Sequence, residues 1–176
     1  VDEKKLYLLY DQIYWTLTFG ETKHYNPVSL RPEMKEYCIF IDGISKAFAA
    51  TGVRVGWSMG PAKVMAKMKA INSHVGAWSP MAEQHATARN LGQREAIDAY
   101  FSEFKKQVEE RLRRIYEGFM QLKQEGFPVD AVAPQAAIYL TVRIDAVGTT
   151  PAAGQRLDQQ TDVTAYLLQE AQLAVV

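Results

Sequence analysis

The sequence predicts an α/β fold in which helices pack against a mostly parallel sheet. Short, continuous apolar runs, typical of strands buried on both faces, occur early in the chain, and residues 6–10 form the first. Amphipathic segments with helical periodicity follow, and residues 94–123 are the longest of them. This alternation within 176 residues favours one domain, or one domain and part of another.

Strands are expected where apolar runs rich in β-branched and aromatic residues are bounded by turn residues. These runs lie at residues 6–10, 37–42 and 53–59. All three strands are expected to be parallel, and the first is expected to be buried on both faces. The polar segment between the first two, residues 15–36, contains Pro27 and Pro32, so a surface loop is expected there.

Helices are expected after the third strand, at residues 61–71, 80–92 and 94–123. In the longest of them, apolar residues recur at spacings of three and four. The members of this apolar seam are Ile97, Phe101, Phe104, Val108, Leu112, Ile115, Phe119 and Leu122. The pattern alone also permits a coiled coil.

Downstream of the long helix, the expected elements are a strand at 138–144, a loop at 145–160 and a helix at 162–172. Polar and apolar residues alternate in the first of these, which is the pattern of a strand with one buried face. Thr161 or Asp162 is the expected N-cap of the last helix, since both side chains can accept a backbone hydrogen bond.

Composition excludes several classes of protein. The chain has 20 basic and 20 acidic residues, so no nucleic-acid or membrane-surface partner is expected. Its only cysteine, Cys38, lies in an apolar run, which favours a reducing, cytoplasmic location. His24, His74 and His85 have no carboxylate or cysteine neighbours at metal-ligand spacing, so no metal site is expected.

Residues 43–56, GISKAFAATGVRVG, carry the clearest chemistry in the sequence. Lys46 follows an apolar strand and is surrounded by small residues, which let another molecule approach and favour the neutral, nucleophilic amine. Arg54 lies eight residues later and presents a planar guanidinium, which suits a phosphate. Together they predict a site for a carbonyl cofactor that carries a phosphate.

This segment resembles the pyridoxal-phosphate attachment motif of the class I and II aminotransferases. The residues that match the motif are Gly43–Lys46, Ala49, Ala50 and Gly52–Gly56. The resemblance implies fold type I of the enzymes that use pyridoxal 5'-phosphate. It also implies that Lys46 is catalytic and forms a Schiff base with the cofactor aldehyde, and that Arg54 binds the phosphate. Gly43 stands where many family members have a phosphate-binding serine, so Ser45 is a further candidate for this role.

Asp11 directly follows the first apolar run, and Tyr14 comes three residues later. An acid at the carboxyl end of a strand is a site candidate in an α/β sheet, although such an aspartate alone is commonly a turn residue. The segment 11–14 resembles the family's aspartate and tyrosine pair. The resemblance implies that Asp11 pairs with the pyridinium nitrogen and that Tyr14 donates to the phenolic oxygen of the cofactor.

The resemblance covers only the middle and C-terminal parts of these enzymes. It implies the second half of a cofactor-binding large domain at 1–93, an interdomain helix at 94–124 and an incomplete small domain at 125–176. Residues 134–139 resemble a family turn, with Gln135 and Ala136 where a glycine is usual. The chain begins at Val1 and ends on an apolar run, so we expect it to be part of a longer homodimeric enzyme and to be inactive alone.

The expected function is the transfer of an amino group between an amino acid, of aspartate type or broad range, and a 2-oxo acid. One alternative is another enzyme of the same fold type, such as a β-elimination lyase, which product analysis would identify. A second alternative is an aminotransferase-like effector domain of a transcription regulator, which would need a basic DNA-binding segment elsewhere in the protein.

Overall fold

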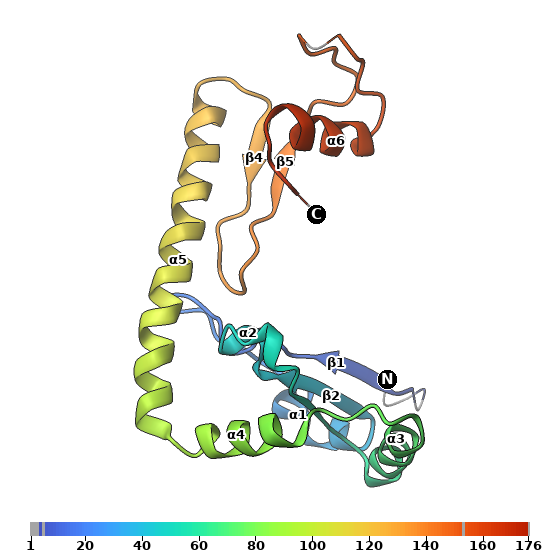
Figure 1. Ribbon diagram of the computed structural model, residues 1–176. Coiled ribbons are helices and arrows are strands. Elements are labelled where there is room, and N and C mark those ends of the chain that lie inside the picture. The colour runs from blue at the N-terminus through green and yellow to red at the C-terminus, as the bar shows by residue number, and fades with distance from the viewer. Residues whose placement is uncertain (1–3, 5, 153, 176) are drawn as a thin grey trace. The chain divides into compact units, whose positions relative to one another are not determined.

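The structure is a computed structural model that describes residues 4, 6–152 and 154–175. The chain divides into two compact units (Figure 1). Unit 1 comprises residues 1–111 and 134–139, and unit 2 comprises residues 112–133 and 140–176. The described part of the chain contains no helix long and apolar enough to cross a membrane.

Unit 1 contains a three-stranded sheet in the order β1-β2-β3, with β1 at Leu8–Asp11, β2 at Cys38–Gly43 and β3 at Gly56–Met59. β1 pairs with β2 in parallel, as predicted. β3 pairs with β2 in the antiparallel direction, so the prediction that all three strands are parallel is wrong. The third strand also begins at Gly56 rather than at residue 53.

The direction of β3 follows from its connection to β2. The short helix α2 (Ile44–Ala47) and the 3-10 turn η2 (Thr51–Val53) reverse the chain at the end of the sheet where β2 finishes. Gly43, the last residue of β2, therefore pairs with Gly56, the first of β3. A parallel strand would need a connection that carries the chain back to the opposite end of the strands, where β2 begins.

The prediction that the first strand is buried on both faces is also wrong. Burial alternates along β1, and the Leu9 side chain is 66% exposed. Leu8 and Tyr10 are half-buried while Leu9 and Asp11 are exposed, so one face of β1 packs on the unit and the other meets solvent. The buried hydrophobic residues of unit 1 are Leu17, Phe19, Met34, Cys38, Ile44, Ala47 and Val55.

The segment predicted as a surface loop, residues 15–36, contains helix α1 (Pro27–Leu30) and the 3-10 helix η1 (Pro32–Glu36). Asn26 begins α1 with a reciprocal cap, because its side chain accepts from the Ser29 N–H and the Ser29 hydroxyl accepts from the Asn26 N–H. The N–H at the first position of a helix has no partner within the helix, so a proline, which lacks this N–H, loses no hydrogen bond there. Both prolines therefore start short helices rather than prevent them.

Three helices follow β3 near their predicted positions. They are α3 (Ala62–Val75), α4 (Met81–Leu91) and α5 (Arg94–Gln124). Gly76 ends α3 with a positive φ of 66°, which a residue without a side chain adopts at little cost. α5 spans 31 residues, and residues from both units belong to it.

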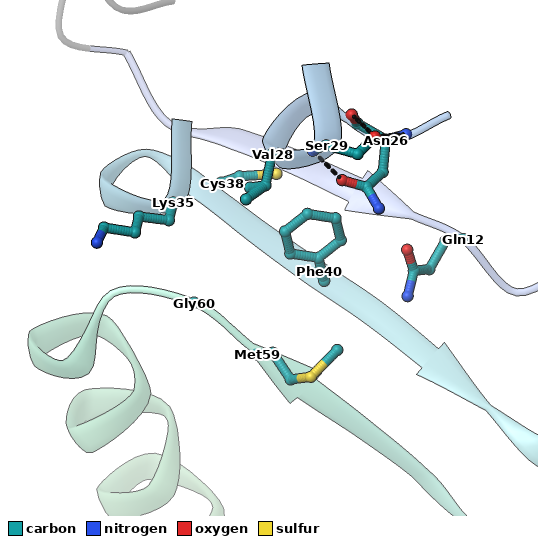
Figure 2. Close-up of a pocket in the computed structure, with 9 residues that line it drawn as sticks. All are labelled: Gln12, Asn26, Val28, Ser29, Lys35, Cys38, Phe40, Met59 and Gly60. Carbon is teal, nitrogen blue, oxygen red and sulfur yellow. Dashed lines mark hydrogen bonds between the residues drawn. The ribbon is translucent and has the colours of Figure 1, made fainter. Parts of the chain in front are cut away.

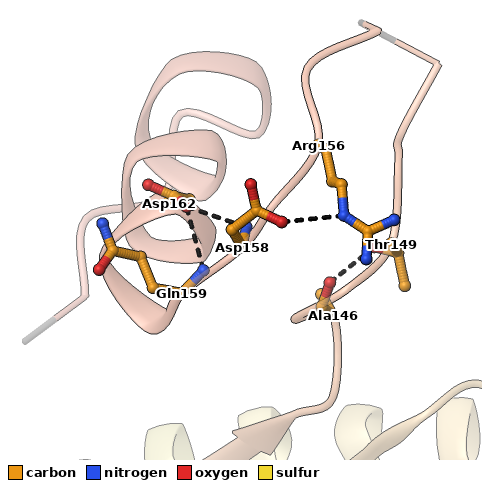
Figure 3. Close-up of polar contacts among 6 residues, drawn as sticks. All are labelled: Ala146, Thr149, Arg156, Asp158, Gln159 and Asp162. Atoms are coloured by element: carbon orange, nitrogen blue, oxygen red, sulfur yellow. Dashed lines mark hydrogen bonds and ion pairs between the residues drawn. The ribbon is translucent and has the colours of Figure 1, made fainter.

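Unit 2 contains the two-stranded antiparallel sheet of β4 (Val129–Ala131) and β5 (Val142–Ile144), together with α6 (Gln160–Glu170). The strand predicted at 138–144 is therefore confined to its last three residues. The predicted N-caps are wrong: Gln159 caps α6, while the Asp162 carboxylate accepts from the N–H groups of Asp158 and Gln159 (Figure 3).

The 145–160 segment of unit 2 is held by local polar contacts. The Arg156 guanidinium donates to the Asp158 carboxylate over 2.8 Å, and the Thr149 hydroxyl donates to the Ala146 carbonyl over 2.6 Å (Figure 3). Leu157 is buried between these surface contacts. Because the two ion-pair partners Arg156 and Asp158 are exposed, the buried leucine contributes more to the stability of this loop than their charges do.

Candidate active site

The sheet of unit 1 brings the predicted site residues to one edge. Asp11 ends β1, and its partner in the register is Ile41, close to the end of the parallel strand β2. Lys46 follows β2 directly, in helix α2. Arg54 precedes the antiparallel strand β3, whose first residue pairs with the last of β2. The topology thus gathers a carboxylate, an amine and a guanidinium from three separate segments of the chain.

Lys46 lies in the last turn of the four-residue helix α2 and is half-buried. Its Nζ is 6.0 Å from the centroid of the Tyr14 ring, which is the limit of a cation–π contact. The neighbouring Ala47 is 5% exposed and packs in the interior, whereas Ala49 and Gly52 further along the segment are exposed. The amine therefore lies on the side of the Tyr14 ring.

Asp11 and Tyr14 belong to the turn that follows β1. The Ile13 N–H donates to the Asp11 carboxylate over 3.1 Å, and the Gln12 N–H donates to the Ile41 carbonyl over 3.0 Å. Asp11 is therefore a turn residue, one of the two roles that the sequence allowed for it. Its side chain stays exposed, so the carboxylate can also accept from a ligand at this edge.

Tyr14 has a partner that sequence reasoning did not identify. Its hydroxyl lies 2.8 Å from the hydroxyl of Tyr139, and the two rings meet edge to face with centroids 5.5 Å apart. Burial raises the pKa of Tyr14 to about 12, and the hydrogen bond with Tyr139 and the charges of Tyr139 and Asp11 add to this shift. The phenol is thereby held in its protonated form.

Arg54 ends the turn η2 with φ 60° and ψ 40°, a left-handed conformation that is uncommon for a residue with a side chain. One terminal nitrogen of its guanidinium donates to the Thr51 carbonyl over 2.7 Å, and the residue is exposed. Ser45 is half-buried, and its carbonyl accepts from the Ala50 N–H over 3.1 Å. The guanidinium has further N–H groups with which it can bind an anion.

Asp42 is a second residue near the site that sequence reasoning did not identify. It is 7% exposed and is the last residue but one of β2. Its carboxylate accepts from the Gly43 N–H over 2.7 Å, from the Trp15 indole over 2.9 Å and from the Gln12 amide over 3.5 Å. A charged residue at the end of an otherwise apolar strand was the available signal.

A cavity of about 510 Å³ lies on unit 1, apart from the candidate site residues (Figure 2). The residues that line it are Gln12, Asn26, Val28, Ser29, Lys35, Cys38, Phe40, Met59 and Gly60. Burial raises the pKa of the Cys38 thiol, so this side chain is a protonated, packed residue rather than a nucleophile. Most of the surface that lines the cavity is apolar, and the candidate site residues Asp11, Lys46 and Arg54 are not among its lining residues.

The candidate residues suit one kind of cofactor. An amine next to a neutral phenol can bind a carbonyl compound with an adjacent hydroxyl, a carboxylate can hold a protonated ring nitrogen, and a guanidinium can bind a phosphate. Pyridoxal 5'-phosphate presents these groups. Among the described residues, no group of three or more potential metal ligands is present.

Comparison with known proteins relates the whole chain to one family. The sequence model of the family described as aminotransferase class I and II matches residues 1–176. The aspartate aminotransferase of Geobacillus stearothermophilus is 33% identical over 167 residues, which are 94% of this chain and 39% of that protein. The chain thus spans about two fifths of the length of the curated relatives it matches.

Solved structures give the same relationship. The aspartate aminotransferase of Rhizobium meliloti has a TM-score of 0.85 at 24% identity, over 99% of this chain and 42% of that chain, which establishes the fold. The aromatic aminotransferase of Pyrococcus horikoshii has a TM-score of 0.83 at 27% identity, over 100% of this chain and 43% of that chain. These likenesses confirm the predicted α/β fold and its assignment to fold type I, with a mixed sheet and helices.

Proposed function

Since the chain belongs to the class I and II aminotransferase family, we propose that its protein transfers an amino group between an amino acid and a 2-oxo acid, with pyridoxal 5'-phosphate as cofactor. The observation that carries the proposal is the position of Lys46. Its amine lies over the Tyr14 ring, at the sheet edge that also bears Asp11 and Arg54.

When bound, the cofactor supplies an electron sink that makes the α-hydrogen of an amino acid acidic. Lys46 is proposed to hold the cofactor and then to carry a proton as a general base and acid. Asp11 is proposed to keep the ring nitrogen protonated by its negative charge. Tyr14 would donate from its hydroxyl to the phenolic oxygen, while Arg54, with Ser45 as a further candidate, would bind the phosphate.

The substrate class is proposed from the relatives. Curated relatives of the chain are named aspartate aminotransferases or aspartate/prephenate aminotransferases, so a dicarboxylic amino acid is the first substrate to assay. A structural relative is named an aromatic aminotransferase, which supports assays with aromatic amino acids as well. If an amino acid with a leaving group on its β-carbon instead lost that group and was converted to ammonia and a 2-oxo acid, with no second 2-oxo acid needed as acceptor, the protein would be a β-elimination lyase.

The activity is proposed for the whole protein and not for residues 1–176 alone. We propose residues 1–93, 94–124 and 125–176 as the second half of a large domain, an interdomain helix and an incomplete small domain. A homodimer is proposed because large apolar side chains between residues 71 and 81 are exposed, and a second copy would cover them; they are Ile71, Val75, Trp78 and Met81. The buried free thiol Cys38 supports a cytoplasmic location.

Covalent trapping tests the proposed function. The whole protein is incubated with pyridoxal 5'-phosphate, reduced with borohydride and digested, and the peptides are analysed by mass spectrometry. The cofactor is expected on the peptide that contains Lys46. Lys46→Ala should remove the label and the transamination, whereas Lys63→Ala, at an exposed lysine of α3, should retain both. A label of normal yield in the Lys46→Ala protein would overturn the assignment.

A further inference from the structure

Tyr139 reaches Tyr14 although 125 residues separate them in sequence. Backbone hydrogen bonds fix the segment that carries it. The Ala137 N–H donates to the Leu17 carbonyl over 2.7 Å, and the Phe19 N–H donates to the Gln135 carbonyl over 2.9 Å. Leu17 and Phe19 are buried, so the contact between residues 17–19 and 135–137 is anchored in the interior of unit 1. The position of Tyr139 is thus set by the backbone.

The two hydroxyl groups have two protons between them, and this count limits what Tyr14 can do. While Tyr14 donates to Tyr139, its single proton is not free for a ligand. When a ligand oxygen accepts from Tyr14, the Tyr139 hydroxyl can turn and donate to the Tyr14 oxygen. The Tyr14 oxygen then keeps a hydrogen-bond partner over the same 2.8 Å, and no side chain has to move.

We propose that Tyr139 is a positioning residue for Tyr14: its hydroxyl donates to the Tyr14 oxygen when Tyr14 donates to the phenolic oxygen of the bound cofactor. The proposal rests on the proposed function, because it takes the cofactor as the ligand of Tyr14. A donor at the Tyr14 oxygen polarises the phenol and strengthens the hydrogen bond that the phenol itself donates. Tyr139 therefore contributes to cofactor affinity without direct contact to the cofactor.

Other charged groups near Tyr14 are consistent with this arrangement. The Asp11 charge favours the neutral phenol, and the Lys46 amine lies 6.0 Å from the ring centroid. Tyr139 is 55% exposed, so its own proton can exchange with water and its hydroxyl can rotate. The Asp11 charge biases the protonation of Tyr14, whereas Tyr139 lies at hydrogen-bond distance from the Tyr14 hydroxyl oxygen.

The test is a set of phenylalanine variants in the whole protein. Tyr139→Phe removes the hydroxyl and keeps the edge-to-face ring contact. Tyr7→Phe is the matched control, because Tyr7 is 59% exposed and lies outside the site. Tyr14→Phe and the double variant complete a cycle that measures whether Tyr139 acts through Tyr14. The readouts are the dissociation constant of the cofactor and the pH midpoint of its visible absorption.

We expect Tyr139→Phe to weaken cofactor binding roughly threefold to tenfold, the effect of one neutral hydrogen bond. The pH midpoint of absorption should rise, because a weaker donor stabilises the ionised phenolic oxygen less. In the Tyr14→Phe background, Tyr139→Phe should change neither readout. Tyr7→Phe should match the unmodified protein throughout.

Unchanged or tighter binding by the Tyr139→Phe protein would overturn the proposal, because Tyr139 would then be a spectator or a competing acceptor. An equal loss in both backgrounds would also overturn it, since Tyr139 would act independently of Tyr14. Normal cofactor binding by Tyr14→Phe together with a normal label in Lys46→Ala would refute the proposed function itself. Failure of the two ideas is therefore distinguishable.

Discussion

The indole N–H of Trp15 donates to the carboxylate of Asp42 over 2.9 Å, and this contact joins the turn after β1 to the end of β2. Trp15 directly follows Tyr14, and Asp42 lies four residues before Lys46. The hydrogen bond thus connects the two segments that carry the phenol and the amine of the candidate site. Asp42 is 7% exposed and Trp15 is 45% exposed, so the connection is buried at the Asp42 end and partly open to solvent at the Trp15 end.

Replacement of Asp42 is expected to lower stability. Asp42→Ala leaves the buried Gly43 N–H without its side-chain acceptor and removes the acceptor of the Trp15 indole. The expected loss is about 1–3 kcal/mol in the free energy of unfolding, measured by urea denaturation of the whole protein. Asp145→Ala is the control, because its ion pair with Arg143 is exposed, and it should cost less than about 1 kcal/mol.

The sequence predicted the positions of the strands better than their direction. The apolar runs before Asp11 and Lys46 placed both residues at strand ends, and β1 and β2 are parallel as expected. The antiparallel direction of β3 was missed, because composition does not distinguish a connection that reverses the chain at the same end of the sheet from one that carries it back to the opposite end. Only the pairing of Gly43 with Gly56 reveals it.

Contacts between distant segments were not accessible from sequence either. Tyr139 was noted as part of a turn but was given no role, because nothing local indicates a partner 125 residues away. Ala137 in that turn has φ 64°, a conformation that favours glycine and that its residue type does not suggest. Asp42 was not identified as a site residue, because its donors lie in the turn after another strand.

Removal of the Asp11 charge should separate cofactor binding from turnover. Asp11→Asn keeps an oxygen for the Ile13 N–H, so the turn after β1 should persist. The amide has no charge to keep a ring nitrogen protonated, so turnover should fall by about a hundredfold or more while the cofactor still binds. Steady-state kinetics and cofactor titration measure the two effects. A near-normal rate in Asp11→Asn would mean that Asp11 only forms the turn.

Arg54 should bind the phosphate of the cofactor, and its backbone conformation allows an informative substitution. Arg54→Gly removes the guanidinium but suits the left-handed φ of 60°, so the change in stability should stay within about 1 kcal/mol. Affinity for pyridoxal phosphate should fall roughly tenfold to a hundredfold, the effect of charge-assisted hydrogen bonds. Binding of pyridoxal, which lacks the phosphate, should hardly change. An equal loss for both compounds would contradict the assignment.

The raised pKa of Tyr14 predicts a loss of stability in alkaline solution. Its pKa is about 12 in the folded protein, mainly through burial, against an ordinary value of 10.0. Between these values the folded state retains a proton that the unfolded state loses, so this contribution is complete below about pH 10 and lost as the pH rises toward 12. Unfolding of the unmodified protein and of Tyr14→Phe across this range gives the difference. The free energy of unfolding of the unmodified protein should fall relative to that of the Tyr14→Phe protein as the pH rises from about 10 toward 12.

Gly43 pairs with Gly56 where β2 meets β3, and a side chain on Gly43 should displace the segment that carries Lys46. A Cβ on Gly43 would lie 2.9 Å from the Val55 carbonyl oxygen and 3.0 Å from the Gly56 Cα, both of which are backbone atoms. Gly43→Ala should therefore destabilise the protein by about 1–3 kcal/mol through overpacking and should weaken cofactor binding.

Gly52→Ala is the matched control for this substitution. A Cβ on Gly52 would meet no atom within 4 Å, and Gly52 does not have the positive φ that disfavours a side chain. Alanine there should leave cofactor affinity unchanged and stability equal or slightly higher, because it restricts the unfolded chain. Thermal unfolding and cofactor titration of both variants test the idea. If Gly43→Ala behaved like Gly52→Ala, the contact between the two strands would not determine the position of Lys46.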